Sequence, residues 1–146
     1  MSQTTPYAFT SAVAQPGMIF DIRPHTVQSF AAEIAMDPGK PVRRGTLPAK
    51  QVLIGDATNF LGVAIFTHTL EQAYPAGGAT YAIGDAVSVL TRGAIWVQTS
   101  VGSIVAGNNA YVTSGGLWTN VVGSNLLVGK FITNGAINEI VAVEIG

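Results

Sequence analysis

The stretch Tyr81–Trp118, YAIGDAVSVLTRGAIWVQTSVGSIVAGNNAYVTSGGLW, decides the fold class of this chain. Apolar residues stand two positions apart at Val87 and Val89 and again at Ile95 and Val97, on either side of Thr91-Arg92-Gly93. A period of two sends successive side chains to opposite faces, which is typical of a half-buried strand. Because Gly93 can supply the left-handed conformation that hairpin loops need, the pattern predicts two short strands joined by a tight turn.

A second copy of this pattern follows the first. Gly84-Asp85 opens one copy, and Gly107-Asn108 opens the other 23 residues later. In each copy a glycine comes nine positions after the first one, and a tryptophan follows it. The distance from this glycine to the tryptophan is one residue shorter in the second copy. We interpret the two copies as a repeated β-hairpin unit, too few for a solenoid, which needs at least three repeats.

The composition predicts one domain with much of its surface covered. The chain has 146 residues, of which 48% are apolar and 10% are charged, against a usual charged share of about 25%. This length suits a single buried core. A chain with so little charge has little well-solvated surface, so we expect other protein to cover part of it.

Several classes of partner and compartment are disfavoured. The net charge of −1 gives no general attraction to nucleic acid. Gly, Asn, Ser and Thr interrupt every apolar run before the roughly 20 residues of a membrane-spanning helix. No cysteine is present, which excludes disulfides and thiolate metal sites. The first residues, MSQTTPYAFTSA, lack the features of a signal peptide, so we expect a protein that is made and used in the cytosol.

The N-terminal third is the least regular part. Residues 1–17 predict an extended arm in which Tyr7 and Phe9 dock on a partner, the alternative being a disordered tail. Met18–Arg23 alternates and predicts a strand. Val27–Met36 has apolar residues at helical spacing, although a strand pair suits it nearly as well.

Four of the seven basic residues lie between positions 40 and 50. Two prolines predict that this segment is a loop with a positive face. One interpretation is a solvated loop. The other is a docking loop whose arginines pair with acids on a partner surface. The residues concerned are Lys40, Arg43, Arg44 and Lys50.

The remaining segments predict further strands. Leu61–Ile65 is apolar on both faces and is expected to be central. Residues 71–80 predict a Pro-Gly-rich loop. Asn125–Thr133 predicts a strand with a bulge or a close approach at Gly129, followed by a hairpin turn at Asn134-Gly135 and the strand 138–145.

These segments together predict an all-β fold. We expect a small β-barrel or β-sandwich of about eight to ten short strands and at most one short helix. Residues 18–146 would form this single domain behind the arm 1–17. The core is expected to include Val87, Val89, Trp96, Tyr111 and Trp118.

No set of residues indicates catalysis, a cofactor or a metal site. His25 and His68 do not stand in a metal-ligand spacing, and no GxSxG nucleophile motif occurs. The carboxylates Asp56, Glu71 and Asp85 lie far apart in the sequence. GNNAYVTSGG lacks the lysine of a phosphate-binding loop, so its glycines are better explained as turn formers.

Aromatic residues leave one other function open. Trp96, Trp118 or Tyr81 could form a platform for a sugar ring if they were exposed on one face. The alternative function is therefore a carbohydrate-binding β-sandwich module.

The run FLGVAIFTHTLEQAY, followed by YAIGDAVSVLTRGAIWVQTSVGSIVAGNNAYV, resembles the structural cement, or capsid decoration, proteins of tailed bacteriophages. That family has a GIA strand, then Y-x-x-GD-x-V-x-V-x-x-x-G-x-xWV, then V-x-AG-x-x-VYV. The matching residues here are Gly62-Val63-Ala64, Tyr81, Gly84-Asp85, Val87, Val89, Gly93, Trp96-Val97, Ala106-Gly107 and Ala110-Tyr111-Val112. KPVRRGTLP and EIVAVEIG are similar to the segments that open and close the family pattern. Asn108 departs from it, because an acid often follows this glycine in the family.

The resemblance covers roughly residues 38–146. It implies a small β-rich protein that binds the outside of an icosahedral phage head and bridges neighbouring major capsid subunits. It also implies a role as a homotrimer or homodimer, with no catalytic residues, no nucleic acid and no membrane involved. Binding energy alone would then stabilise the mature lattice.

Overall fold

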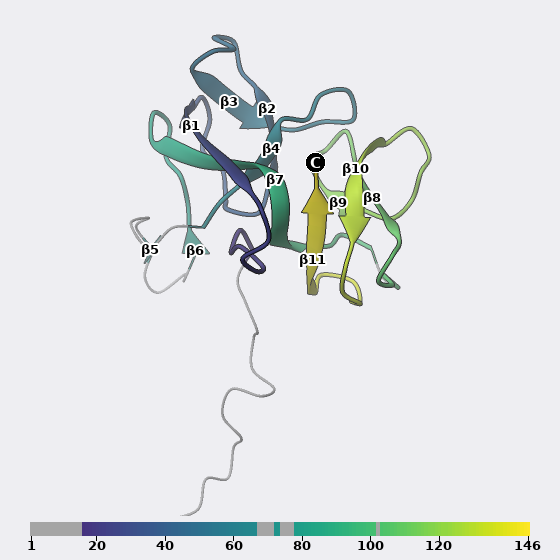
Figure 1. Cartoon of the computed structure of the whole chain (residues 1–146). Coiled ribbons are helices and arrows are strands. Elements are labelled where there is room, and N and C mark those ends of the chain that lie inside the picture. Colours follow the sequence, from purple (N-terminus) through teal and green to yellow (C-terminus); the bar gives the residue numbers. More distant parts are fainter. Residues whose placement is uncertain (1–15, 67–71, 74–77, 102) are drawn as a thin grey trace, which may run out of the picture.

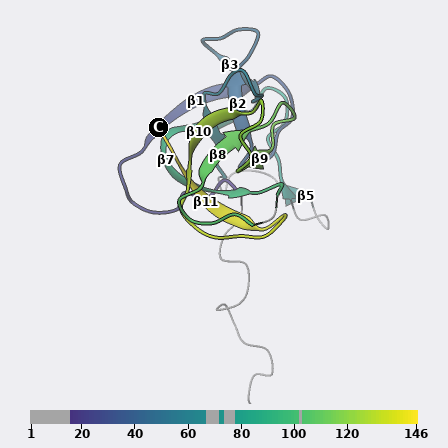
Figure 2. The ribbon, with the colours of Figure 1, turned by 90° about the vertical axis from the view of Figure 1, so that its right-hand side faces the viewer.

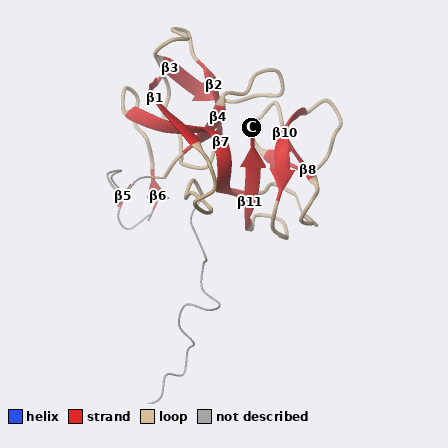
Figure 3. Cartoon of the chain, viewed as in Figure 1, coloured by secondary structure: helices blue, strands red, loops and turns tan. Residues whose placement is uncertain are grey.

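The computed structural model describes residues 16–66, 72–73, 78–101 and 103–146. All regular structure in this part of the chain is β (Figure 3), as the sequence predicted. The strands are β1 Thr26–Ala32, β2 Pro41–Arg44, β3 Gln51–Ile54, β4 Gly62–Ala64, β5 Gln72–Ala73, β6 Gly78–Ala79, β7 Ala86–Gln98, β8 Asn109–Val112, β9 Trp118–Thr119, β10 Leu126–Phe131 and β11 Ile140–Ile145.

Nine of these strands form one sheet in the order β1-β3-β2-β4-β7-β11-β10-β8-β9 (Figure 1). Because β1 also pairs with β7, the strands β1, β3, β2, β4 and β7 close into a small barrel. The second part of the sheet has the order β7-β11-β10-β8-β9. Its last strand in this order, β9, returns to the end of β7, where Trp118 forms a β-bridge with Thr99. In the view turned by 90°, β8, β10 and β11 lie in front of this barrel (Figure 2).

Strand β7 belongs to both parts of the sheet. Its first half, up to Arg92, pairs with β1 and β4, and its second half, from Gly93, pairs with β11. Gly93 has a φ of 130°, where a side chain is disfavoured. The predicted hairpin at Thr91-Arg92-Gly93 is therefore wrong. The chain bends at Gly93 but continues, because each half finds its hydrogen-bonding partners in other strands.

One type of turn occurs four times. In each, a residue that makes a single β-bridge is followed by a four-residue turn and then by a strand. The third residue of the turn has a positive φ. These positions are Gly39, Gly84, Gly107 and Asn138. The type II turn requires a positive φ there, and Gly and Asn adopt it at least cost. The bridges pair the turns two by two, Met36 with Tyr81 and Ile104 with Gly135.

Two of the N-terminal predictions need correction. Of the two interpretations of Val27–Met36, the helix is wrong and a strand is present over residues 27–32, because β1 pairs with β3 on one side and β7 on the other. Met18–Arg23 makes one isolated bridge, between Ile19 and Ile95, instead of a strand. Pairing with distant strands overrides local spacing here.

The segment 40–50 is also more regular than predicted. Its prolines stand at the first residue of β2 and in the turn after it, where a missing N–H does little harm. Of the expected loop, only Lys40 and the part after Arg44 are irregular. The loop predicted for residues 71–80 contains the short pair β5 and β6.

Predictions for the other strands were closer. β4 is fully buried between β2 and β7, as expected of a central strand. The register of β10 shifts between Leu127 and Gly129, which confirms the bulge, and a Cβ at Gly129 would overlap the carbonyl oxygen of Glu144. The predicted turn at Asn134-Gly135 is wrong in position. These residues lie before the turn 136–139, and Gly135 bridges to Ile104.

Two clusters of buried side chains form the core. One fills the small barrel around Val42, Val52 and Val89, and the other packs beside the second part of the sheet around Trp118 and Phe131. Of the five expected core residues, Val87, Val89, Tyr111 and Trp118 are buried. Trp96 is half-buried, contrary to expectation, and its ring packs against Phe20 with 5.0 Å between centroids.

Of the expected arm, only Pro16 and Gly17 are described. Gly17 is buried, donates its N–H to the carbonyl of Trp96 and accepts a hydrogen bond from Phe66. These two hydrogen bonds join Gly17 to the β domain. Tyr7 and Phe9 lie outside the described residues.

Candidate partner-binding surface

The four basic residues of segment 40–50 do not form one positive face. Arg43 and Arg44 are neighbours on β2, so their side chains leave the sheet on opposite sides. Lys40 is half-buried before the strand, and Lys50 is exposed after the turn. The predicted docking loop is thus split between surfaces by the strand that contains its arginines.

Both arginines already have contacts within the chain. Arg43 Nε lies 3.4 Å from Asp56 Oδ2, an ion pair without hydrogen-bond geometry. Arg44 Nη1 donates to the carbonyl of Pro48 at 2.7 Å, and its guanidinium lies over the Phe30 ring. The pKa of Asp56 is lowered mainly by hydrogen bonds from Thr58, with a smaller contribution from the charge of Arg43.

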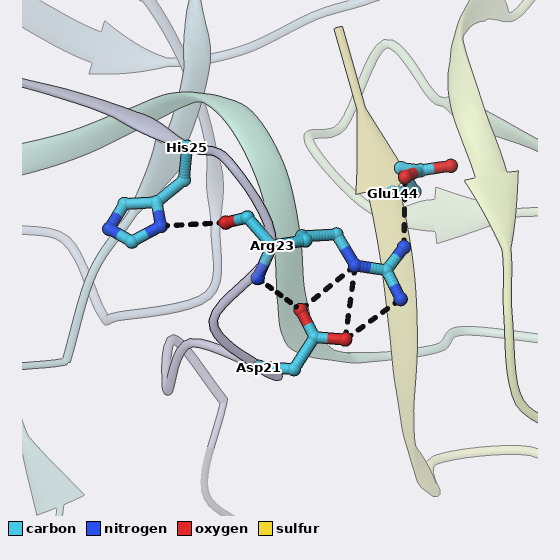
Figure 4. Close-up of polar contacts among 4 residues, drawn as sticks. All are labelled: Asp21, Arg23, His25 and Glu144. Carbon is cyan, nitrogen blue, oxygen red and sulfur yellow. Dashed lines mark hydrogen bonds and ion pairs between the residues drawn. The ribbon is translucent and has the colours of Figure 1, made fainter.

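A second cluster of charged residues, which the sequence analysis did not single out, is centred on Arg23 (Figure 4). Arg23 donates from Nε and Nη2 to the carboxylate of Asp21, each at 2.8 Å, and from Nη1 to Glu144 Oε2 at 2.8 Å. The same contacts lower the pKa of Asp21 and raise that of Arg23. Arg23 thereby fastens the segment before β1 to the last strand, β11. The His25 ring nitrogen Nδ1 lies 3.0 Å from the carbonyl of Arg23.

Arg23 also lines an open groove of about 390 Å³. Arg92 and Lys130 line it too, so the groove gathers all three basic residues outside segment 40–50. Both are exposed, and neither forms an ion pair with another described residue. Among the described residues that line the groove, Glu144 has the one acidic side chain. Backbone at Gly93, Gly129 and Gly146 completes its wall.

Large apolar side chains are exposed at several turns. Ile83, Val105 and Ile137 stand in three of the four related turns, at 73%, 54% and 60% exposure. A further exposed group around the β9–β10 connection contains Val121, Val122 and Leu127. Ile22, which precedes Arg23 in the segment before β1, is exposed as well.

The aromatic residues do not form an exposed platform. Trp118 is 2% exposed, and its indole N–H donates to the carbonyl of Gly39. Tyr81 is buried and donates its hydroxyl to the carbonyl of Ile65. The Trp96 ring packs against Phe20. These three residues therefore do not form the exposed face that the alternative sugar-binding function requires. In the described residues, His, Cys, Asp and Glu do not gather in groups of three that could hold a metal ion.

Known proteins share this architecture. In the part of the chain that the structure describes, no helix is long and apolar enough to cross a membrane. The family model described as structural cement protein (E217 gp24/Pam3 gp6) matches residues 2–146. The chain belongs to this structural cement protein family. The match is wider than the resemblance over residues 38–146 that the sequence motifs indicated, since it includes most of the N-terminal segment.

Two solved structures have a similar fold. One is in the capsid of Myoviridae phage XM1, with 20% identity, 97% of each chain covered and a TM-score of 0.72. The other is the N base of head fiber gp8.5 in bacteriophage phi29, with 12% identity, 84% of this chain and 95% of that chain covered, and a TM-score of 0.59. A search of curated proteins found no match. As a member of the cement family, the protein is a phage structural protein associated with the capsid.

Proposed function

We propose that this protein binds the outer surface of the mature phage head and stabilises contacts between neighbouring major capsid subunits. The cement family match over residues 2–146 carries the proposal. The protein would be made in the host cytoplasm and then added to the head as a homotrimer or homodimer. It would act by binding alone, without catalysis, nucleic acid or a membrane.

The surface supports this role. Only 10% of the residues are charged, and several exposed turns carry large apolar side chains. Permanent protein–protein contacts bury side chains of this kind. A protein that binds the mature lattice and not its precursor stabilises the mature state by mass action.

Co-sedimentation with phage heads tests the proposal. Purified protein is mixed with expanded, undecorated heads and, as the control, with unexpanded procapsids. We expect saturable binding to expanded heads at a fixed number of copies per capsid subunit. Failure of a folded protein to bind expanded heads would contradict the proposal.

The arm is tested in the same assay. A variant without residues 1–17 should occupy fewer capsid sites, because linked contacts raise the effective affinity. Its β-sheet circular dichroism should match that of the full chain, which controls for folding. Full occupancy by this variant would remove the arm from the proposed mechanism.

A further inference from the structure

We propose that the groove beside Arg23, Arg92 and Lys130 binds an acidic segment of the capsid subunit, and that two cations of the groove pair with its carboxylates. This inference deepens the proposed function and rests on it. The groove is separate from segment 40–50, where the sequence analysis placed the basic contacts.

Unequal pairing of the three cations is the first argument. Arg23 is already neutralised by Asp21 and Glu144, each at 2.8 Å. Arg92 and Lys130 form no ion pair with any residue that the structure describes. The groove therefore has two cations available for a ligand and one cation that is used to build it.

The position of Lys130 adds to this argument. Lys130 stands directly opposite Glu144 in the β10–β11 ladder, where a cross-strand ion pair would be expected to form. Glu144 instead accepts from Arg23 Nη1. Arg23 thus engages the acid that would otherwise pair with Lys130, and Lys130 is left for another carboxylate.

The shape of the groove suits a peptide. Gly93, Gly129 and Gly146 contribute backbone and no side chain to its wall. Ile22, the residue before Arg23, is 99% exposed. A segment with carboxylates toward the groove and an apolar residue toward Ile22 would match both features.

Charge favours a protein ligand over nucleic acid. Binding to a phosphate backbone usually needs a row of cations, whereas this groove offers two unpaired cations beside the carboxylate of Glu144. The whole chain has a net charge of −1. One or two carboxylates of a partner would be enough to complete the ion pairs.

The test removes the two free charges without adding repulsion. The variant Arg92→Gln/Lys130→Gln is compared with Lys40→Gln/Lys50→Gln, which makes the same change in net charge outside the groove. Binding to expanded heads should weaken about tenfold or more for the groove variant and clearly less for the control, which changes the lysines of segment 40–50. Equal binding by wild type and both variants would overturn the groove proposal and leave the proposed function standing.

A second measurement decides the groove even if the heads do not bind the wild-type protein. A blocked Glu-Ile-Glu peptide is titrated into the isotope-labelled full chain, with Gln-Ile-Gln as the matched control. The acidic peptide should shift the amide signals of Gly93, Gly129 and Gly146, and the groove variant should lose these shifts. Absence of shifts in the wild type would overturn the proposal.

Other occupants give different results. If a short oligothymidylate shifts the same amides at lower concentration than the acidic peptide, the groove is a phosphate site and the proposal is wrong. If the groove variant changes the oligomeric state in sedimentation velocity, the occupant is a second copy of the chain, and the proposal is again wrong.

Discussion

The two copies of the repeated sequence unit begin alike and end differently. Ala82 N–H donates to Asp85 Oδ2 at 2.8 Å in the first copy, and Val105 N–H donates to Asn108 Oδ1 at 3.0 Å in the second. After this shared turn the first copy runs on as β7, whereas the second folds into the hairpin of β8 and β9.

One pair of equivalent positions differs in its contacts between the two copies. Thr113 Oγ1 accepts the N–H groups of Gly115 and Leu117, at 3.2 and 3.1 Å, and so shapes the β8–β9 loop. The equivalent residue of the first copy is Leu90, which has no hydroxyl and is fully buried. Leu90 pairs with Val27 and Val63 in the flanking strands. The same opening thus leads to a turn where a local acceptor is present, and to a strand where neighbours occupy both sides.

The two tryptophans should give the largest contrast. Trp118→Ala should cost about 3–5 kcal/mol, because it removes a buried ring that packs against Phe60 and donates to Gly39. Trp96→Ala should cost about 1 kcal/mol, since the ring is half-buried and its aromatic contact is with Phe20. Urea unfolding of both variants checks this, and equal losses would contradict the assignment of the rings to inner and outer faces.

The two positive-φ glycines on either side of β8 come next. A Cβ at Gly116 would meet the side chain of Ile54, so Gly116→Ala should cost about 2–4 kcal/mol through strain and overpacking. Gly107 has a positive φ but nothing within 4 Å of its Cβ position. Gly107→Ala should therefore cost only about 1 kcal/mol. Thermal or urea unfolding measures both, and a Gly116→Ala variant as stable as Gly107→Ala would refute the close contact.

Asn138 provides a finer version of this test. It occupies the equivalent turn position with a φ of 63°. Gly107→Asn should then be less destabilising than Gly107→Ala, because Asn tolerates the left-handed region better. The opposite order would count against the equivalence of the four turns.

The hydroxyl of Thr113 should have a moderate effect. Thr113→Val removes the acceptor of two N–H groups and should cost about 1–2 kcal/mol. The control, Thr91→Val, removes a single long hydrogen bond of 3.3 Å to the carbonyl of Thr26 and should cost less. Unfolding measurements together with the amide shifts of Gly115 and Leu117 separate a local change from a global one. Unchanged shifts would mean that Thr113 does not shape the loop.

The smallest effect is expected at the shared turn itself. Asp85→Asn should change stability by less than about 0.5 kcal/mol, because Asn108 performs the same role in the other copy. Asp85→Ala should cost about 1 kcal/mol by leaving the Ala82 N–H without its acceptor. A large loss in the Asn variant would show that the two openings are not interchangeable.

Local patterns predicted much of this fold. Alternation, turn residues and the apolar β4 segment correctly indicated an all-β chain, and an interior glycine correctly indicated the bulge in β10. The same alternation could have placed Trp96 correctly. It lies between Ile95 and Val97, which are both buried, so its side chain must face the other side of the strand.

What the sequence could not reveal depends on distant residues. Gly93 looks like a hairpin glycine until β11 is known to pair with the residues after it. Asp21 and Arg23 stand two apart and would share a face in an extended chain, so that ion pair was open to prediction. The contact of Arg23 with Glu144 spans 121 residues of sequence, and the groove that depends on it was therefore missed.

The double membership of β7 has a consequence for the order of folding. Its second half, from Gly93 to Gln98, pairs on one side with β11, which begins only at Ile140. During synthesis this half must wait for more than forty further residues, and until then its unpaired N–H and C=O groups can recruit another chain. Strand β11 thus closes the exposed edge, and such sequence-distant pairing makes folding slow.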